Sequence, residues 1–115
     1  MKRDDTYRLS VIKKLGADLL RYLQENDIDV AEIVSNQVVQ WTITTPLYNI
    51  GEQVYNLSGE LKAAHPEIPW HRISGMRHRL VHDYEDTNWS IVAEAVMNDV
   101  PLFLGQVAEI QIEDD

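Results

Sequence analysis

Cysteine is missing from this chain of 115 residues. Its absence excludes a disulfide-stabilised scaffold and any thiolate-bound metal, and it fits a protein of a reducing compartment. The first residues, Met-Lys-Arg-Asp-Asp-Thr, do not develop the apolar segment of a secretory signal. We therefore expect a cytoplasmic protein.

Long hydrophobic runs are missing as well. The longest uncharged stretch, residues 33–51, has the length of a membrane span but contains nine Ser, Thr, Asn, Gln or Pro residues. That is too polar for a segment facing lipid. Hydrophobic residues make up 44% and charged residues 25% of the chain, which is typical of folded globular proteins. We expect one domain covering residues 1–115, with no membrane partner.

Positive charge is scarce, because the formal net charge is −9. This balance argues against a general nucleic-acid coat protein. Between residues 62 and 82, however, four basic residues stand against the single acid Glu67, a local balance of +3 that leaves −12 for the remainder. All four histidines fall in this same window, at positions 65, 71, 78 and 82. Chance clustering on a solvated helix face is one explanation, and a functional basic patch is the better one.

Apolar residues recur at helical spacing through the first half of the chain. A helix is expected over about residues 4–26, a turn over 26–29 and a second helical region over 30–64. The second region contains a seam with 4-3-4-3-4 spacing: Ile43, Leu47, Ile50, Val54, Leu57 and Leu61. Pro46 lies inside it, and an interior proline removes a backbone hydrogen bond, so a kink or break is expected there.

The second half of the chain continues the helical pattern. Prolines at 66 and 69 predict a loop over residues 65–69, followed by a third helical region over 70–84. Asp86 or Thr87 is expected to cap a further helix, and Pro101 lies in the first turn of the last one. No strand pattern and no repeat competes. The predicted fold is all-α, an antiparallel bundle of four to five helices with a kinked long second helix.

The third helical region places an arginine among apolar residues. On an ideal helix, Arg77 falls within the stripe formed by Ile73, Met76, Leu80, Val81 and Tyr84. An arginine in such a position needs a carboxylate, a phosphate or a partner surface. A snorkelling side chain or a structural ion pair, for instance with Glu52, is the ordinary explanation. Trp70 and Trp89 are expected to anchor the core on either side.

The opposite face of the same region carries imidazoles. His71, Gly75, His78 and His82 share it, with Arg72 and Arg79 beside them. Glycine there allows another backbone or a phosphate to come close. The pair His78 and His82 is spaced for a metal, but no carboxylate is preset on that face, so we rank a metal site below catalysis.

These segments resemble a known family. Ile50-Gly51-Glu52, then Leu61 to Trp70, then Gly75-Met76-Arg77-His78-Arg79-Leu80-Val81-His82-Asp83-Tyr84 are similar to the HepT-like branch of the HEPN domains. The likeness spans nearly the whole chain, including the turn at residues 98–102. An isolated Arg-x4-His is a weak signal, but the same motif followed by x-Tyr and preceded by the other elements in order is specific.

The resemblance implies a metal-independent RNA endonuclease without cofactors, dimeric in most members, that acts as the toxin of a toxin–antitoxin pair. It assigns catalysis to Arg77 and His82. It also implies that a partner nucleotidyltransferase antitoxin (MntA-like) silences the toxin by adding AMP to Tyr84; by spacing alone, a core tyrosine is as good an interpretation. His78 departs from the family, which usually has a small polar residue such as Asn there, so its role stays open.

The expected mechanism uses the 2′-OH of RNA as nucleophile, with histidine moving protons and arginine holding the phosphate. Residues five apart project about 140° apart on an ideal helix, so Arg77 and His82 do not share a face. Either the helix distorts near its end or a second copy completes the site; we favour a composite site in a homodimer. His78, Glu52 and Arg79 are candidate supporting residues, although Glu52 is equally well an ordinary exposed glutamate.

Two other interpretations remain. A non-catalytic partner of a minimal nucleotidyltransferase would use the same basic face to hold a nucleotide or substrate. A purely structural bundle would leave the clustered histidines unexplained. The presence of both Arg77 and His82 favours the enzyme, because a binding protein needs positive charge but not that particular pair.

Overall fold

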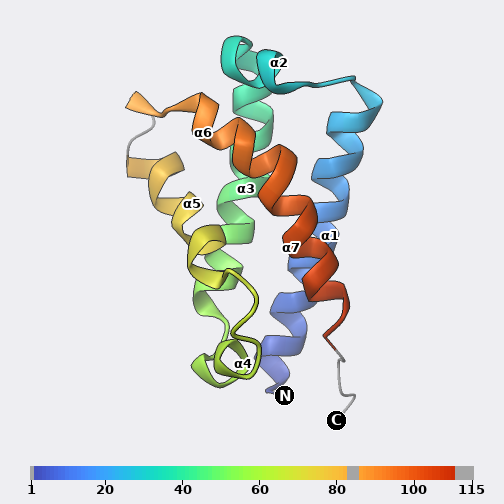
Figure 1. Ribbon diagram of the computed structural model, residues 1–115, viewed down its shortest axis with the longest axis vertical. Coiled ribbons are helices and arrows are strands. Elements are labelled where there is room, and N and C mark those ends of the chain that lie inside the picture. The colour runs from blue at the N-terminus through green and yellow to red at the C-terminus, as the bar shows by residue number, and fades with distance from the viewer. Residues whose placement is uncertain (1, 83–85, 111–115) are drawn as a thin grey trace.

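The protein is built from helices, as Figure 1 shows for a computed structural model that describes residues 2–82 and 86–110, the side chains of residues 81 and 82 excepted. Within that part of the chain there is no strand, so the predicted all-α fold is confirmed. The helices are α1 (Arg3–Glu25), α2 (Val30–Ser35), α3 (Gln37–Asn56), α4 (Gly59–Ala64), α5 (Trp70–His82), α6 (Trp89–Glu94) and α7 (Val100–Ala108).

Helix α1 begins and ends within one residue of the predicted bounds, and the turn at residues 26–27 follows it. It buries one stripe that includes Leu9, Ile12 and Leu19. Asp5 lies in the first turn of α1, and its side chain is buried at 3% exposed. Its carboxylate accepts hydrogen bonds from the backbone N–H and the hydroxyl of Ser58, at 2.9 and 2.5 Å. This buried charge therefore ties the start of α1 to the start of α4.

Of the kink or break expected at Pro46, the break is wrong, because α3 continues through the proline. The helical region is interrupted instead at Asn36 and at residues 57–58. Asn36 caps α3 by accepting from the N–H groups of Val38 and Val39, and Ser58 caps α4 by accepting from that of Leu61. Proline costs α3 one backbone hydrogen bond, and the burial of Ile43 and Leu47 on either side offsets that loss.

The last two predicted helices form one continuous rod. A π-helical turn at Ala95–Asp99 joins α6 to α7. In it the N–H of Val100 donates to the carbonyl of Ala95, a wider turn that accommodates the ring of Pro101 immediately after it. The residue that caps α6 is Asn88, one position after the predicted Thr87; its side chain accepts from the N–H groups of Ser90 and Ile91.

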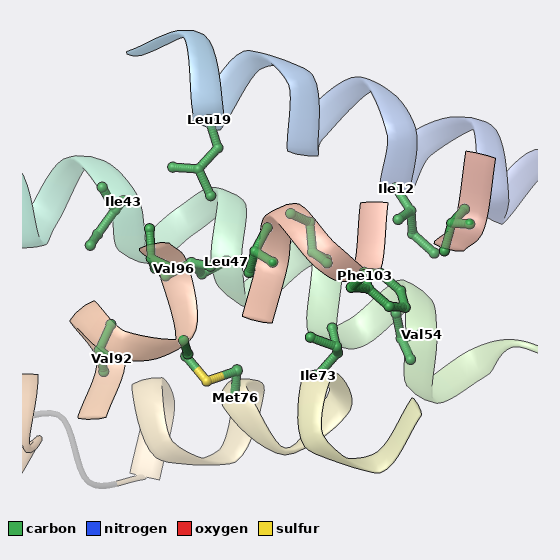
Figure 2. Close-up of a cluster of buried hydrophobic side chains, with 14 of the residues drawn as sticks. Ile12, Leu19, Ile43, Leu47, Val54, Ile73, Met76, Val92, Val96 and Phe103 are labelled. Carbon is green, nitrogen blue, oxygen red and sulfur yellow. The ribbon is translucent and has the colours of Figure 1, made fainter. Parts of the chain in front are cut away.

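A single hydrophobic cluster lies between α1, α3, α5 and the α6–α7 rod, and Figure 2 shows these four contributing side chains to it. Every residue of the predicted seam in the second helical region is buried. By length and composition alone, the rod from Trp89 to Ala108 could cross a membrane. In the fold, its side chains Val92, Val96 and Phe103 are fully buried in the core, whereas Ile91 and Leu102 are exposed.

Candidate functional site

Helix α5 carries Arg77, His78, Arg79 and His82 among the predicted site residues, and it packs along α3 (Figure 1). Its Ile73, Met76 and Leu80 are buried, as predicted for one face of this helix. Trp70, at its first residue, is an anchor: the indole N–H donates to the carbonyl of His65 at 3.0 Å. The same ring meets Phe103 edge-on, with centroids 5.8 Å apart. The start of α5 is thus fixed to both the preceding loop and the core.

Gly51 allows α5 to approach α3 closely beside Arg77. A Cβ atom at position 51 would lie 3.1 Å from the Cβ and 3.2 Å from the backbone nitrogen of Arg77, and 3.4 Å from the carbonyl oxygen of Ile73. Ordinary carbon contacts are about 3.5–4.0 Å, so only glycine fits here without displacement. This close contact therefore fixes the distance between Arg77 and α3.

Arg77 is held at the junction of the two helices. Its Nη1 donates to Oε1 of Glu52 at 3.2 Å, and both side chains are about one-third exposed. Its guanidinium carbon also lies 3.7 Å from the centroid of the Tyr55 ring. The ion pair with Glu52, proposed above as the ordinary explanation, is therefore formed. The guanidinium is fixed at one edge and on one face, which leaves further N–H donors for a ligand.

Tyr55 was missed by the sequence reasoning. A signal for it exists, because residues three apart on a helix are neighbours and Tyr55 follows Glu52 by three. Its ring is 56% exposed even though it contacts Arg77, so both groups are accessible from solvent. Together, Glu52, Tyr55 and Arg77 form a cluster that we call the arginine cluster.

The histidine face of α5 is where the helical spacing predicts it. His71, Gly75 and His78 are exposed, on the side away from the core. Arg79 is half-buried and lies near α6, on the opposite side of α5 from the arginine cluster. The structure therefore brings Glu52 to Arg77 and places Arg79 on the other side of α5.

His82 is the last residue of α5, and its side chain lies outside the described part. Tyr84 lies outside the described residues altogether. Among the residues that are described, no three His, Asp or Glu side chains gather as a metal site would require. The predicted His78–His82 metal pair includes a side chain that is not described, so this alternative stays a prediction.

Comparison with known proteins identifies the family. The profile described as "Ribonuclease HepT-like" matches residues 11–110. A protein of Caldanaerobacter subterraneus subsp. tengcongensis named "Putative RNase TTE0752" is 35% identical over 83 residues, 72% of this chain and 74% of the relative. "Putative RNase MJ0127" of Methanocaldococcus jannaschii is 31% identical over 85 residues, 74% of this chain and 70% of the relative. "Probable ribonuclease HepT" of Thermococcus cleftensis is 26% identical over 97 residues, 83% and 88% of the two chains.

No solved structure matches the chain. The family profile nevertheless covers most of its length, and the relatives align with it over about three quarters or more of the chain. The order of motifs in Ile50-Gly51-Glu52 and around Arg77 had already indicated the same family. The chain belongs to the HepT-like ribonuclease family of the HEPN superfamily.

Proposed function

We propose that this protein is a cytoplasmic, metal-independent RNA endonuclease and the toxin of a toxin–antitoxin pair, with Arg77 and His82 as its catalytic residues. The observation that carries the proposal is the arginine cluster. Glu52 and Tyr55 hold the Arg77 guanidinium in one orientation at an accessible helix junction, five residues before the histidine of the family motif. These two contacts hold the Arg77 side chain while about one-third of it stays exposed, so its remaining N–H groups can reach a phosphate.

The proposed chemistry is a transfer within the RNA strand itself. The 2′-oxygen attacks the adjacent phosphorus while its proton passes to a base, and the 5′-oxygen of the next nucleotide leaves with a proton from an acid. The products are a 2′,3′-cyclic phosphate and a 5′-hydroxyl. Histidine serves the proton transfers, because its charge changes near neutral pH. Arg77 donates in-plane N–H groups to the non-bridging phosphate oxygens, where negative charge accumulates.

Cleavage in chelator is the first test. Purified protein should cut single-stranded RNA in excess EDTA and leave 2′,3′-cyclic phosphate ends. Arg77→Ala and His82→Ala should each abolish cleavage while circular dichroism shows intact helices. Arg21→Ala on α1, an exposed arginine paired with Asp18, is the matched control and should cleave normally. Normal cleavage by both site variants, or a strict need for added divalent metal, rejects this catalytic centre.

A homodimer would complete the site. Helix α5 is α-helical as far as His82, so its backbone offers no distortion to bring positions 77 and 82 onto one face. Helix α3 carries three exposed large apolar side chains, Val38 and Trp41 near its start and Tyr55 near its end. A second copy packed along α3 would bury them and bring two α5 helices together near the two-fold axis.

The dimer is tested by sedimentation at micromolar concentration. Wild-type protein should sediment as a dimer, and Trp41→Glu should sediment as a monomer, since a charge replaces a ring that is 55% exposed on the free surface. The monomeric variant should lose cleavage. A wild-type monomer that cleaves RNA rejects the composite site.

The proposal also includes inhibition of the ribonuclease by a partner nucleotidyltransferase. Tyr84 follows the last residue of α5 by two positions, so an AMP group there would add a phosphodiester close in sequence to His82. Such an anion competes with the RNA phosphate for the same donors. The partner with ATP should add whole AMP units to Tyr84 and end cleavage. Tyr84→Phe should stay active and resist this inactivation.

Mass spectrometry locates the modification. AMP found on another residue, or inhibition of Tyr84→Phe by the partner without ATP, would show that silencing works by occlusion instead. The second candidate function, a non-catalytic partner that holds a nucleotide or substrate, predicts RNA or nucleotide binding by wild-type protein with no cleavage products at any time point.

A further inference from the structure

Two neighbouring hollows follow the side of α5 that faces away from the arginine cluster. One, of about 610 Å³, lies between α5 and the rod formed by α6 and the π-helical turn. The other, of about 490 Å³, lies between Lys62 of α4, the loop at residues 65–69 and the start of α5. His71 and Arg72 line both hollows, so the two adjoin each other at the start of α5. We call this surface the α5 groove.

One wall of the α5 groove is basic. Lys62, His71, Arg72 and Arg79 line it, and they include every Lys and Arg of the basic sequence window except Arg77. Partial burial lowers the pKa of Lys62, and nearby Asp5 acts against that shift. Helix α5 also begins here with no acidic residue in its first turn, so the positive end of its dipole adds to the wall. The chain as a whole has a net charge of −9, and these basic side chains concentrate positive charge along the α5 groove.

The floor and the opposite wall have a different character. Met76, Ile91 and Ala95 present apolar surface, and Gly75 leaves open space above the helix, because a Cβ added there would meet nothing within 4 Å. Glu94 and Asp99 on the far wall are acidic, and Asp99 lies 3.6 Å from Arg72. A ligand in this groove therefore meets cations on one side, an apolar floor, and hydrogen-bond acceptors on the other side.

We propose that the α5 groove binds a single-stranded part of the RNA substrate on the side of α5 opposite the arginine cluster, with its phosphates on the Arg72 and Arg79 wall and its bases over the apolar floor. The proposal rests on the ribonuclease function proposed above and names the path of its substrate. Single-stranded RNA fits because its unpaired bases can lie on an apolar surface while its backbone follows positive charge. On the far wall, the carboxylate of Glu94 accepts from exocyclic amino groups, as Asp and Glu do from cytosine.

Binding is measured separately from cleavage. A fluorescent 12-nucleotide RNA with 2′-O-methyl sugars lacks the attacking hydroxyl, so it reports affinity alone by fluorescence anisotropy. Arg72→Gln and Arg79→Gln should each weaken its binding about tenfold and each reduce the slope of log affinity against log salt by about one. Arg21→Gln removes the same charge from α1 and should change neither quantity by more than about twofold. If Arg72→Gln and Arg79→Gln lose no more affinity than Arg21→Gln does, the proposed RNA-binding role of the groove is wrong.

A second variant separates binding from mere support of the fold. Asp99→Asn breaks the ion pair but keeps Arg72 and removes a negative charge from the groove. If Arg72 binds phosphate, this variant should bind the RNA several-fold more tightly. If Arg72 only holds α5 to the π-helical turn, Asp99→Asn should weaken binding as Arg72→Gln does, and that result overturns the proposal.

The two proposals fail in different ways. Tight, Arg72-dependent and Arg79-dependent binding without any cleavage of ordinary RNA rejects the nuclease and keeps the groove. Cleavage of ordinary RNA that is undiminished in both groove variants at low substrate concentration keeps the nuclease and rejects the groove. The acidic wall also predicts a preference among the bases. A 2′-O-methyl cytidine oligomer should bind more tightly than a 2′-O-methyl uridine oligomer. Equal affinities would reject the proposed orientation of the bases.

Discussion

Replacing Gly51 by alanine perturbs the closest approach between α3 and α5. The new methyl group would lie 3.1 Å from the Cβ of Arg77 and 3.2 Å from its backbone nitrogen. Both atoms belong to or adjoin the backbone of α5, so rotation of a side chain cannot relieve the contact. The helices must separate by roughly half an ångström to restore ordinary van der Waals distances.

The expected magnitude follows from two opposing terms. Overpacking of this kind costs about 1–3 kcal/mol. Alanine in place of glycine inside a helix contributes about 1 kcal/mol in the favourable direction. Gly105→Ala in α7 is the matched control, because a Cβ there meets nothing within 4 Å. The control should gain about 1 kcal/mol, and Gly51→Ala should lie about 2 kcal/mol below it, a gap of roughly 8 °C in melting temperature.

Urea and thermal unfolding followed by circular dichroism measure this gap. In the same preparations, RNA cleavage by Gly51→Ala should fall at least tenfold, because Arg77 moves away from its supported position, whereas Gly105→Ala should cleave normally. Equal stabilisation of the two variants would refute the close approach. A destabilised Gly51→Ala that cleaves at the wild-type rate would refute the link between this contact and the position of Arg77.

Three further predictions concern other contacts. Asp5→Ala should lower the free energy of unfolding by about 2–3 kcal/mol in urea titrations, because it removes two hydrogen bonds to Ser58 from a buried carboxylate; a loss under about 0.5 kcal/mol would contradict that role. Asn88→Ala should cost about 1 kcal/mol through the lost cap of α6, and an unchanged unfolding midpoint would show that another group caps it. Tyr55→Leu should keep the fold but reduce the rate of RNA cleavage several-fold by removing the ring beneath Arg77, and wild-type kinetics in this variant would argue against positioning by Tyr55.

Much of the fold follows from the sequence through local spacing. The seam from Ile43 to Leu61 is buried as its period indicates, and two prolines are enough to place the loop at residues 65–69. Trp70 anchors the core as expected. These features depend on neighbours within a few turns, which is why periodicity and backbone chemistry suffice for them.

Part of the candidate site follows in the same way. The exposed row of His71, Gly75 and His78 and the intrusion of Arg77 into the apolar stripe are both readable from one helical wheel. The wheel also indicates that Arg77 needs a partner, and Glu52 was one candidate for it. The motif around Arg77 was sufficient to indicate the family.

The tertiary structure alone decided where the helical region is interrupted and which side chains support Arg77. Pro46 stays inside α3 because burial on both sides outweighs one lost hydrogen bond. The helical region is interrupted instead at residues 57–58, where Ser58 caps α4 and contacts Asp5, 53 positions earlier. The Tyr55 ring reaches Arg77, and the acidic wall reaches the α5 groove, only after separate helices pack together. Such contacts join residues far apart in the chain, so no local pattern specifies them; they are set by which helix faces must be buried against one another.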